Sequence, residues 1–190
     1  MKILGISGSL RQGSYNTSLL RTAAGLLPDD VQLDVWDRLK EVPPYDEDDD
    51  VEPAPAPVAD LRAAVAEADA ILFATPEYNS SVPGQLKNAI DWVSRPHATN
   101  PLRNKPVAVI GASTGAFGAV WSQADLRKVL AATGARVVEG EVAVGHAPTR
   151  FDESGVLVDE NLLEQFQEVL AELLEATEAR TDIVGGGVPA

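Results

Sequence analysis

A run of small and polar residues near the start of the chain, residues 8–16 (GSLRQGSYN), combines the groups that bind a phosphate. Ser9, Ser14 and Asn16 supply hydrogen bonds, and Arg11 supplies a guanidinium that can hold two phosphate oxygens at once. A helix that begins near Asn16 would add free N–H groups and the positive end of its dipole. The run therefore indicates an anion site. The alternative is a polar turn in which Asn16 only caps the helix and Arg11 is solvated.

A second segment, residues 75–84 (TPEYNSSVPG), offers groups that suit a flat ring. Tyr78 presents a flat face, and Asn79 with nearby backbone groups offers donors and acceptors. Such a loop could frame an isoalloxazine ring, whose faces are apolar and whose pyrimidine edge is polar. The alternative is a loop in which Asn79 or Ser81 only caps the next helix.

A third segment, residues 111–118 (GASTGAFG), has glycines that permit close backbone approach to a ligand. It also matches G-x-S-x-G, the nucleophile elbow of many hydrolases, with Ser113 as the nucleophile. A catalytic triad would need an acid and a later histidine; Asp125 and two glutamates precede His146. Because Asp125 falls on a predicted helix and the chain is short for that fold, a hydrolase is the less favoured hypothesis.

Composition narrows the classes of partner. A chain of 190 residues fits one domain. Its formal net charge of −14 repels nucleic acids and anionic membranes, so we expect neither as a partner. An anionic cofactor would need a local positive site, and Arg11 in the first run offers one.

No cysteine is present, and we expect no metal site. Without a signal-like or membrane-spanning segment, a cytoplasmic location is expected.

The pattern of apolar residues predicts the elements that position these segments. Apolar runs predict strands, the last one interrupted around Gly140, at residues 3–6, 31–36, 70–74, 107–110 and 137–144. Amphipathic helices alternate with them, at about residues 16–27, 61–68, 82–94, 120–130 and 159–179. This alternation predicts an α/β fold, a flavodoxin-like three-layer sandwich with a five-stranded parallel sheet of order 2-1-3-4-5. In that order the three polar segments meet at the carboxyl ends of strands one, three and four.

Other segments leave alternatives open. Residues 43–57 are acidic and rich in proline, which excludes a regular helix and predicts a surface loop, or a loop that borders the site or a subunit contact. Trp92 packs either in the core or across a subunit interface. We expect a single FMN-binding domain over residues 1–180 and a disordered tail over residues 181–190.

The three segments together, GSLRQGSYN, PEYNSSVPGQLKNAIDW and GASTGAFG, resemble the NADPH-dependent FMN reductase family, which includes quinone, chromate and azo reductases. The resemblance spans about residues 1–166. It implies roles for each segment: the FMN phosphate would be held by Ser9, Arg11, Ser14, the Tyr15 backbone and Asn16; the isoalloxazine ring would be lined by Pro76, Glu77, Tyr78 and Asn79; and the pocket would be completed by Ser113 and the glycines around it, including Gly115.

The resemblance also implies an activity. Hydride would pass from NADPH or NADH through flavin N5 to a quinone, free flavin or similar small acceptor. Because the flavin carries that chemistry, no side chain is assigned a catalytic role. The family is typically homodimeric or homotetrameric, with flavin sites near the subunit interface. An electron carrier like flavodoxin, without turnover of NADPH, is the alternative. Arg11 favours the reductase, since the flavodoxin phosphate loop is rich in Thr and Ser and free of Arg.

Overall fold

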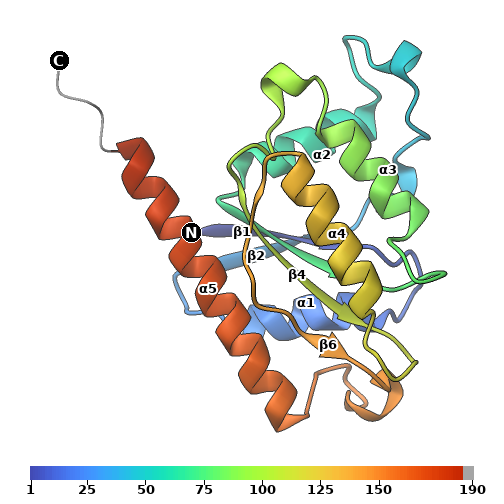
Figure 1. The fold of residues 1–190 in the computed structure, drawn as a ribbon, viewed down its shortest axis with the longest axis vertical. Coiled ribbons are helices and arrows are strands. Elements are labelled where there is room, and N and C mark those ends of the chain that lie inside the picture. Colours follow the sequence, from blue (N-terminus) through green and yellow to red (C-terminus); the bar gives the residue numbers. More distant parts are fainter. Residues whose placement is uncertain (186–190) are drawn as a thin grey trace.

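The chain folds around one parallel sheet, seen edge-on among its helices in Figure 1. The computed structural model describes residues 1–185, and side chains as far as residue 180. The strands are β1 (Lys2–Ser7), β2 (Gln32–Trp36), β3 (Ala70–Thr75), β4 (Pro106–Ala112), β5 (Arg136–Val137) and β6 (Ala143–Val144). Their order is β2-β1-β3-β4-β5, and β6 also pairs with β4. The predicted fold and strand order are confirmed.

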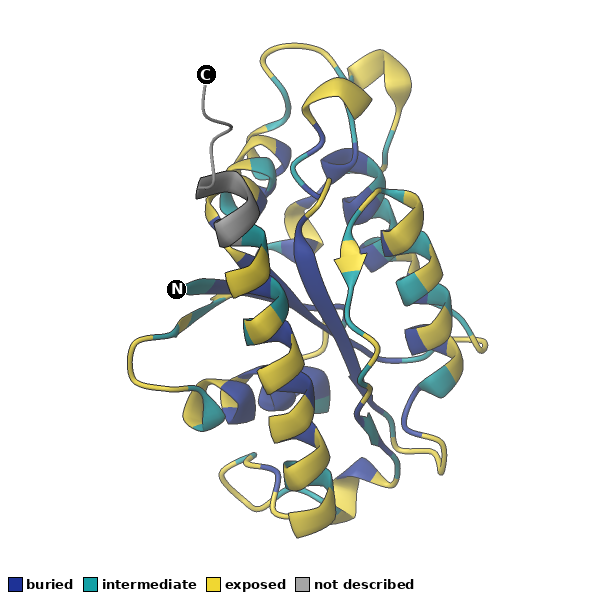
Figure 2. Cartoon of the chain, turned by 60° about the vertical axis from the view of Figure 1, so that its left-hand side comes forward, coloured by how far each residue is buried: buried dark blue, intermediate teal, exposed yellow. Residues whose placement is uncertain are grey.

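Helices cover both faces of this sheet. They are α1 (Tyr15–Leu26), α2 (Ala56–Glu67), α3 (Gly84–Val93), α4 (Val120–Ala132) and α5 (Glu160–Gly185). Helices α2, α3 and α4 pack on one face, where they bury Leu61, Ile90 and Leu126. Helices α1 and α5 pack on the other, where they bury Leu20 and Phe166. Figure 2 shows the central strands as the buried layer between helices whose outer faces are exposed.

The fifth predicted strand is split into β5 and β6 by an arginine. Arg127 of α4 extends its guanidinium between β4 and the segment that joins the two short strands. It donates hydrogen bonds to the carbonyl oxygens of Val138 (2.6 Å), Gly140 (2.5 Å) and Val109 (3.0 Å). The Gly140 N–H turns away and donates to Glu172 of α5 (2.8 Å). Because these backbone groups are engaged by side chains, they cannot pair strand to strand.

The proline-rich segment is a surface loop that is fixed to α3. Asn88 and Trp92 both donate to the carbonyl oxygen of Pro43, at 2.8 and 2.9 Å. The Trp92 side chain is fully buried, which identifies it as a core residue. The end of the segment differs from the prediction, since α2 already begins at Ala56 and includes Pro57. Proline is tolerated there because the first turn of a helix does not use its N–H groups.

Helix α5 continues to Gly185, beyond the predicted domain boundary at residue 180. Residues 181–185 of the predicted disordered tail therefore belong to this helix, and residues 186–190 lie outside the described part of the chain, where disorder stays a prediction. Within residues 1–185, no helix is both long enough and apolar enough to cross a membrane.

Candidate active site

A cavity of about 160 Å³ opens at the carboxyl ends of β1, β3 and β4. The three polar segments meet there, as the strand order predicted. The cavity is lined by Ser9, Arg11, Ser14, Tyr15, Asn16, Pro76, Glu77, Tyr78, Ala112, Ser113 and Thr114. Of these, Ala112 and Thr114 were not predicted. Both lie in or beside the predicted third segment, and no side-chain chemistry distinguished them in the sequence.

The amino end of α1 faces this cavity with unused hydrogen-bond donors. Ser14 is the N-cap, and its Oγ accepts from the backbone N–H of Asn16 at 3.2 Å. The interpretation of Asn16 as the cap is therefore wrong. Among the described residues, the backbone N–H groups of Tyr15 and Thr17 have no acceptor. Such groups at a helix amino end are suited to a phosphate.

Arg11 adds the positive charge at this end of the cavity. Its side chain is exposed, and its guanidinium lies 5.6 Å from the centre of the Tyr15 ring. One guanidinium N–H donates to the carbonyl oxygen of Gln12 at 3.3 Å. No carboxylate of the described residues lies within 4.0 Å of it. The charge of Arg11 is therefore available for an anion.

Asn16 is buried and holds the first loop, residues 8–16 after β1, against β4. Its Nδ2 donates to the carbonyl oxygen of Ala112 at 3.0 Å, and its Oδ1 accepts the N–H of Ala112 at 2.9 Å. Both ends of the amide are engaged in these bonds. Asn16 thus shapes the cavity by positioning two of its walls.

The second loop is a tight turn. Tyr78 and Ser81 exchange two backbone hydrogen bonds of 3.3 and 3.2 Å, and Asn79 and Ser80 between them have φ values of 53° and 59°. Asn79 is exposed at the tip and does not line the cavity. Neither Asn79 nor Ser81 caps α3, whose N-cap is Pro83. The turn leaves Tyr78 at the mouth of the cavity with 55% of its surface exposed.

Glu77 joins this loop to α4. Its Oε2 accepts the backbone N–H groups of Trp121 (3.0 Å) and Ser122 (3.1 Å) in the first turn of that helix. A carboxylate at a helix amino end is stabilised by the helix dipole. Glu77 therefore fixes the wall of the cavity and is already engaged as an acceptor.

The third loop does not form a hydrolase site. The Ser113 Oγ donates to the carbonyl oxygen of Gly115 at 3.4 Å, and Gly115 itself does not line the cavity. The Asp125 carboxylate accepts from the Ser81 hydroxyl at 2.7 Å. His146 is exposed, and within residues 1–180 its ring bonds neither Ser113 nor Asp125. The geometry therefore lacks the hydrogen-bonded chain that a triad requires.

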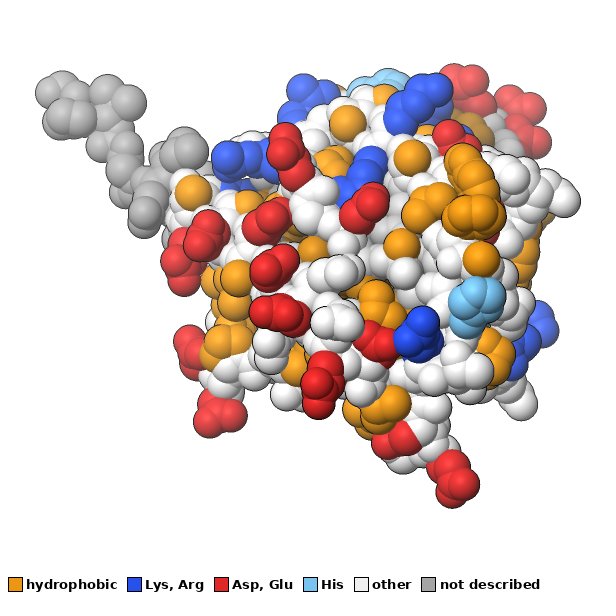
Figure 3. Space-filling view, turned by 60° about the horizontal axis from the view of Figure 1, so that its bottom comes forward, with side chains coloured by type: hydrophobic (Ala, Val, Ile, Leu, Met, Phe, Trp, Pro, Cys, Tyr) orange, Lys and Arg blue, Asp and Glu red, His pale blue; other side chains and the backbone are white. Residues whose placement is uncertain are grey.

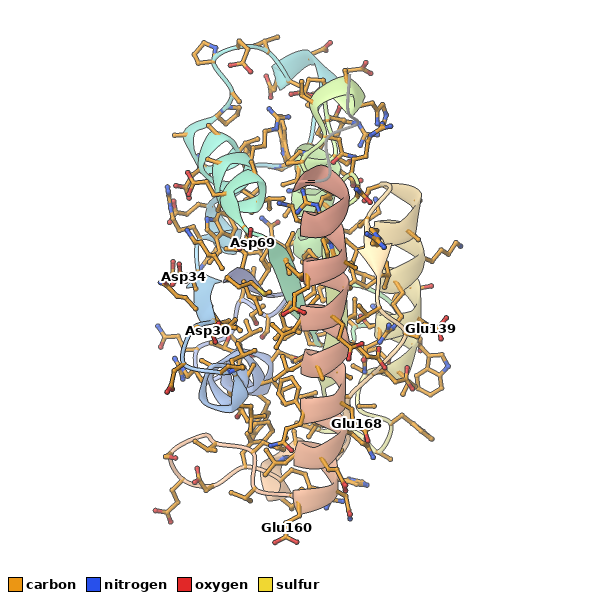
Figure 4. The ribbon with its side chains drawn as sticks, turned by 90° about the vertical axis from the view of Figure 1, so that its left-hand side faces the viewer. Asp30, Asp34, Asp69, Glu139, Glu160 and Glu168 are labelled. Carbon is orange, nitrogen blue, oxygen red and sulfur yellow. The ribbon has the colours of Figure 1, made fainter. Side chains whose placement is uncertain are left out.

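Glu77 is the acidic residue in the lining of the cavity, and the other carboxylates of the described residues lie outside it. The labelled carboxylates in Figure 4 are spread over the molecule rather than gathered at one point: Glu160 and Glu168 lie on α5, Asp30 and Asp34 at β2, Asp69 before β3, and Glu139 after β5. Within the described residues, no group of three or more His, Cys, Asp or Glu is arranged to hold a metal ion. Carboxylates also gather on one half of the face in Figure 3, where cationic side chains are few. Against this acidic surface, the unpaired Arg11 is a local positive site.

Known proteins share this architecture. A sequence model described as NADPH-dependent FMN reductase matches residues 1–149, which include every residue that lines the cavity. The chain belongs to the NADPH-dependent FMN reductase family. It is therefore an oxidoreductase, with FMN as cofactor and NAD(P)H as reductant, as the motifs implied.

Individual members of the family are similar over most of their length. An NAD(P)H-dependent FMN reductase of Pseudomonas aeruginosa is 43% identical over 174 residues, which are 91% of this chain and 93% of the relative. A 2-hydroxy-1,4-benzoquinone reductase of a Burkholderia species is 38% identical over 88% of this chain and 91% of its own. The structure of FerB, a flavoenzyme NAD(P)H:(acceptor) oxidoreductase of Paracoccus denitrificans, superposes with a TM-score of 0.83 at 30% identity. The match covers 94% of this chain and 98% of FerB.

The cavity fits the cofactor of the family. FMN carries a phosphate at one end and a flat ring with a polar edge at the other. The free N–H groups of α1, the Ser9 hydroxyl and the Arg11 guanidinium are donors of the kind that a phosphate needs. Pro76, Tyr78 and Ala112 supply apolar surface for the ring. The lining thus divides into the two kinds of surface that FMN needs.

Proposed function

We propose that this protein is an FMN-dependent NAD(P)H oxidoreductase whose electron acceptor is a quinone, free flavin or similar small molecule. Bound FMN would supply hydride transfer, taking hydride from NAD(P)H at N5 and passing reducing equivalents to the acceptor. The observation that carries the proposal is the cavity at the carboxyl ends of β1, β3 and β4, whose lining has both donors suited to a phosphate and apolar surface suited to a ring.

The side chains of the cavity would bind and orient rather than transfer protons. Ser9, Arg11 and the amino end of α1 would hold the phosphate, while Asn16 keeps that loop in place. Pro76, Glu77 and Tyr78 are proposed to lie along the ring, with Ser113 on the opposite loop. Asn79 and Gly115 lie next to them in these two loops, outside the lining of the cavity. Glu77 already accepts two backbone N–H groups, so it acts through the wall of the cavity. No catalytic side chain is proposed.

The acceptor is proposed from two observations. A relative that is 38% identical is named 2-hydroxy-1,4-benzoquinone reductase, so the reduction of a quinone is known among similar chains. Tyr78 is half-exposed at the mouth of the cavity, where it would present a flat face to an incoming aromatic ring.

An absorption spectrum of the purified protein tests the proposal. After the addition of FMN, we expect a flavin band that bleaches anaerobically with NADPH or NADH and returns when benzoquinone is added. Steady oxidation of NAD(P)H by quinone without a partner reductase would distinguish the enzyme from an electron carrier. A protein that neither binds FMN nor oxidises NAD(P)H would contradict the proposal.

We also propose that the protein is a homodimer or homotetramer, and the cytoplasmic location stays a prediction. Two neighbouring aromatic side chains support the assembly: Phe117 is 62% exposed and Trp121 is 48% exposed, with ring centres 5.1 Å apart. Adjacent exposed aromatic rings are typical of subunit contacts. Light scattering of the wild type and of the Phe117→Ser/Trp121→Ser double variant tests this. We expect the molar mass in solution to be lower for the variant than for the wild type. A wild-type protein that is monomeric at micromolar concentration would refute the proposed assembly.

A further inference from the structure

A second cavity lies next to the active site, on the other side of the first loop. It has a volume of about 230 Å³ and opens between the carboxyl ends of β1 and β2. Ser9 and Arg11 line both this cavity and the active-site cavity. The two cavities therefore meet at the side chains that we propose for the FMN phosphate.

The second cavity carries positive charge and free hydroxyl donors. Lys40 is exposed and lines it together with Arg11, and in the described structure neither cation has a carboxylate within 4.0 Å. The Ser7 Oγ accepts both from the N–H of Ser9 (3.3 Å) and from the Thr17 hydroxyl (3.2 Å). The proton of Ser7 is therefore left to donate. In a chain of net charge −14, two unpaired cations beside one opening favour an anion.

The same cavity also has an apolar wall. Leu10 is 47% exposed and Val35 is 37% exposed, and both line it beside the buried ring of Trp36. At its edge, Gln12 adds an amide that can both donate and accept hydrogen bonds, and Asp37 adds a carboxylate that accepts them. An apolar wall, a polar edge and a cationic end together fit a ligand that joins a flat heterocycle to a phosphate.

We propose that this cavity takes the adenylate half of FAD, so that the protein binds FAD as well as FMN. The proposal rests on the proposed function, because it places the flavin phosphate at Ser9 and Arg11. Any group attached to that phosphate must leave the active-site cavity where these two residues lie, and the second cavity begins there. In FAD the attached group is AMP, whose phosphate forms a pyrophosphate with the flavin phosphate, and this pyrophosphate would place two negative charges opposite Arg11 and Lys40.

Titration of the apoprotein with FMN and FAD tests the proposal, with wild type, Lys40→Gln and Lys128→Gln compared by flavin fluorescence. Lys128 is the matched control because it is exposed on α4 and lines neither cavity. We expect wild type to bind FAD within about ten-fold of FMN. Loss of a charged hydrogen bond in Lys40→Gln should raise the Kd for FAD roughly ten-fold or more. FMN ends at its phosphate, so its Kd should change less than about two-fold.

Three results would overturn the proposal while the proposed function stands. The first is that the wild type binds FAD more than about a hundred-fold more weakly than FMN, and the second is that Lys40→Gln changes the Kd of both flavins equally. The third is that Lys40→Gln leaves the Kd for FAD unchanged but raises the KM for NADPH. The last result would assign the cavity to the hydride donor. If neither flavin binds the wild type, the proposed function itself fails. Thermal unfolding of Lys40→Gln, expected to match that of the wild type, separates a binding defect from a folding defect.

Discussion

Asn16 and Ala112 exchange two hydrogen bonds, of 3.0 and 2.9 Å, although they are 96 positions apart in the chain. Both residues are buried, and both line the active-site cavity. The pair joins the loop after β1 to the end of β4, so that the proposed phosphate donors and the ring surface keep a fixed separation.

Replacement of Asn16 by alanine should therefore affect both stability and binding. The N–H and carbonyl groups of Ala112 would be left without their partners, and we expect the free energy of unfolding to fall by about 2–4 kcal/mol. The Kd for FMN should rise, because the first loop is no longer held. Urea unfolding and flavin titration measure the two effects. Asn161→Ala, at an exposed position of α5, is the control. A loss below about 1 kcal/mol would show that the pair is not a structural link.

Arg11 should contribute to binding without contributing to stability. Its side chain is exposed and forms no ion pair within the described residues. We expect Arg11→Ala to weaken FMN binding by about 1.5–3 kcal/mol, the range for a hydrogen bond to a charged group. Arg11→Lys should retain part of the binding free energy, since lysine keeps the positive charge but lacks the paired N–H donors of the guanidinium. Arg21→Ala, on the exposed side of α1, should leave the Kd unchanged. Equal affinity of Arg11→Ala and wild type would exclude Arg11 as the phosphate anchor.

Arg127 should be among the more important polar residues for stability. Its guanidinium donates hydrogen bonds to three backbone carbonyl groups. Burial lowers the pKa of Arg127, although an arginine remains charged at neutral pH. Arg127→Met would remove these donors, so we expect a loss of about 2–4 kcal/mol in urea unfolding. Lys128→Met changes a neighbouring cation that is exposed, and we expect less than about 0.5 kcal/mol. Similar losses in the two variants would argue against the role of Arg127.

Lys105 should make stability depend on pH in the alkaline range. It is buried at the carboxyl end of α2, where its ammonium donates to the carbonyl oxygens of Ala66 and Ala68. Burial, with a smaller contribution from the nearby charge of Arg180, lowers the pKa of Lys105 from 10.5 to about 8. Between these two pH values the unfolded chain holds the proton and the folded chain releases it, so stability rises with pH. Below about pH 8 both states hold the proton, and this contribution is constant.

Urea unfolding of wild type and Lys105→Met between pH 7 and 10 measures this contribution. We expect the stability of the wild type to gain on the order of 1 kcal/mol relative to the variant across this range. Parallel profiles for the two proteins would show that Lys105 has the same pKa in the folded and unfolded chain.

Much of the fold follows from local patterns in the sequence. Fully apolar runs such as 70–74 belong to central strands, and helices with one apolar stripe cover them. Once the strand order is known, the three polar loops must meet, because parallel strands end at the same edge. The interruption of the last strand was also visible at Gly140. The cause of the interruption could not be predicted, since the guanidinium that divides the strand belongs to Arg127 of α4.

The sequence by itself determined the family, the sheet order and nearly all of the residues that line the cavity. These depend on residue type and on the spacing of apolar positions along the chain. Only the tertiary structure decided what each polar side chain does. It assigned the cap of α1 to Ser14, the amide of Asn16 to Ala112, and the carboxylate of Glu77 to α4. It also revealed the second cavity beside the phosphate loop. The physical reason is that a hydrogen bond depends on the position of a partner in space, which residue spacing along the chain does not specify.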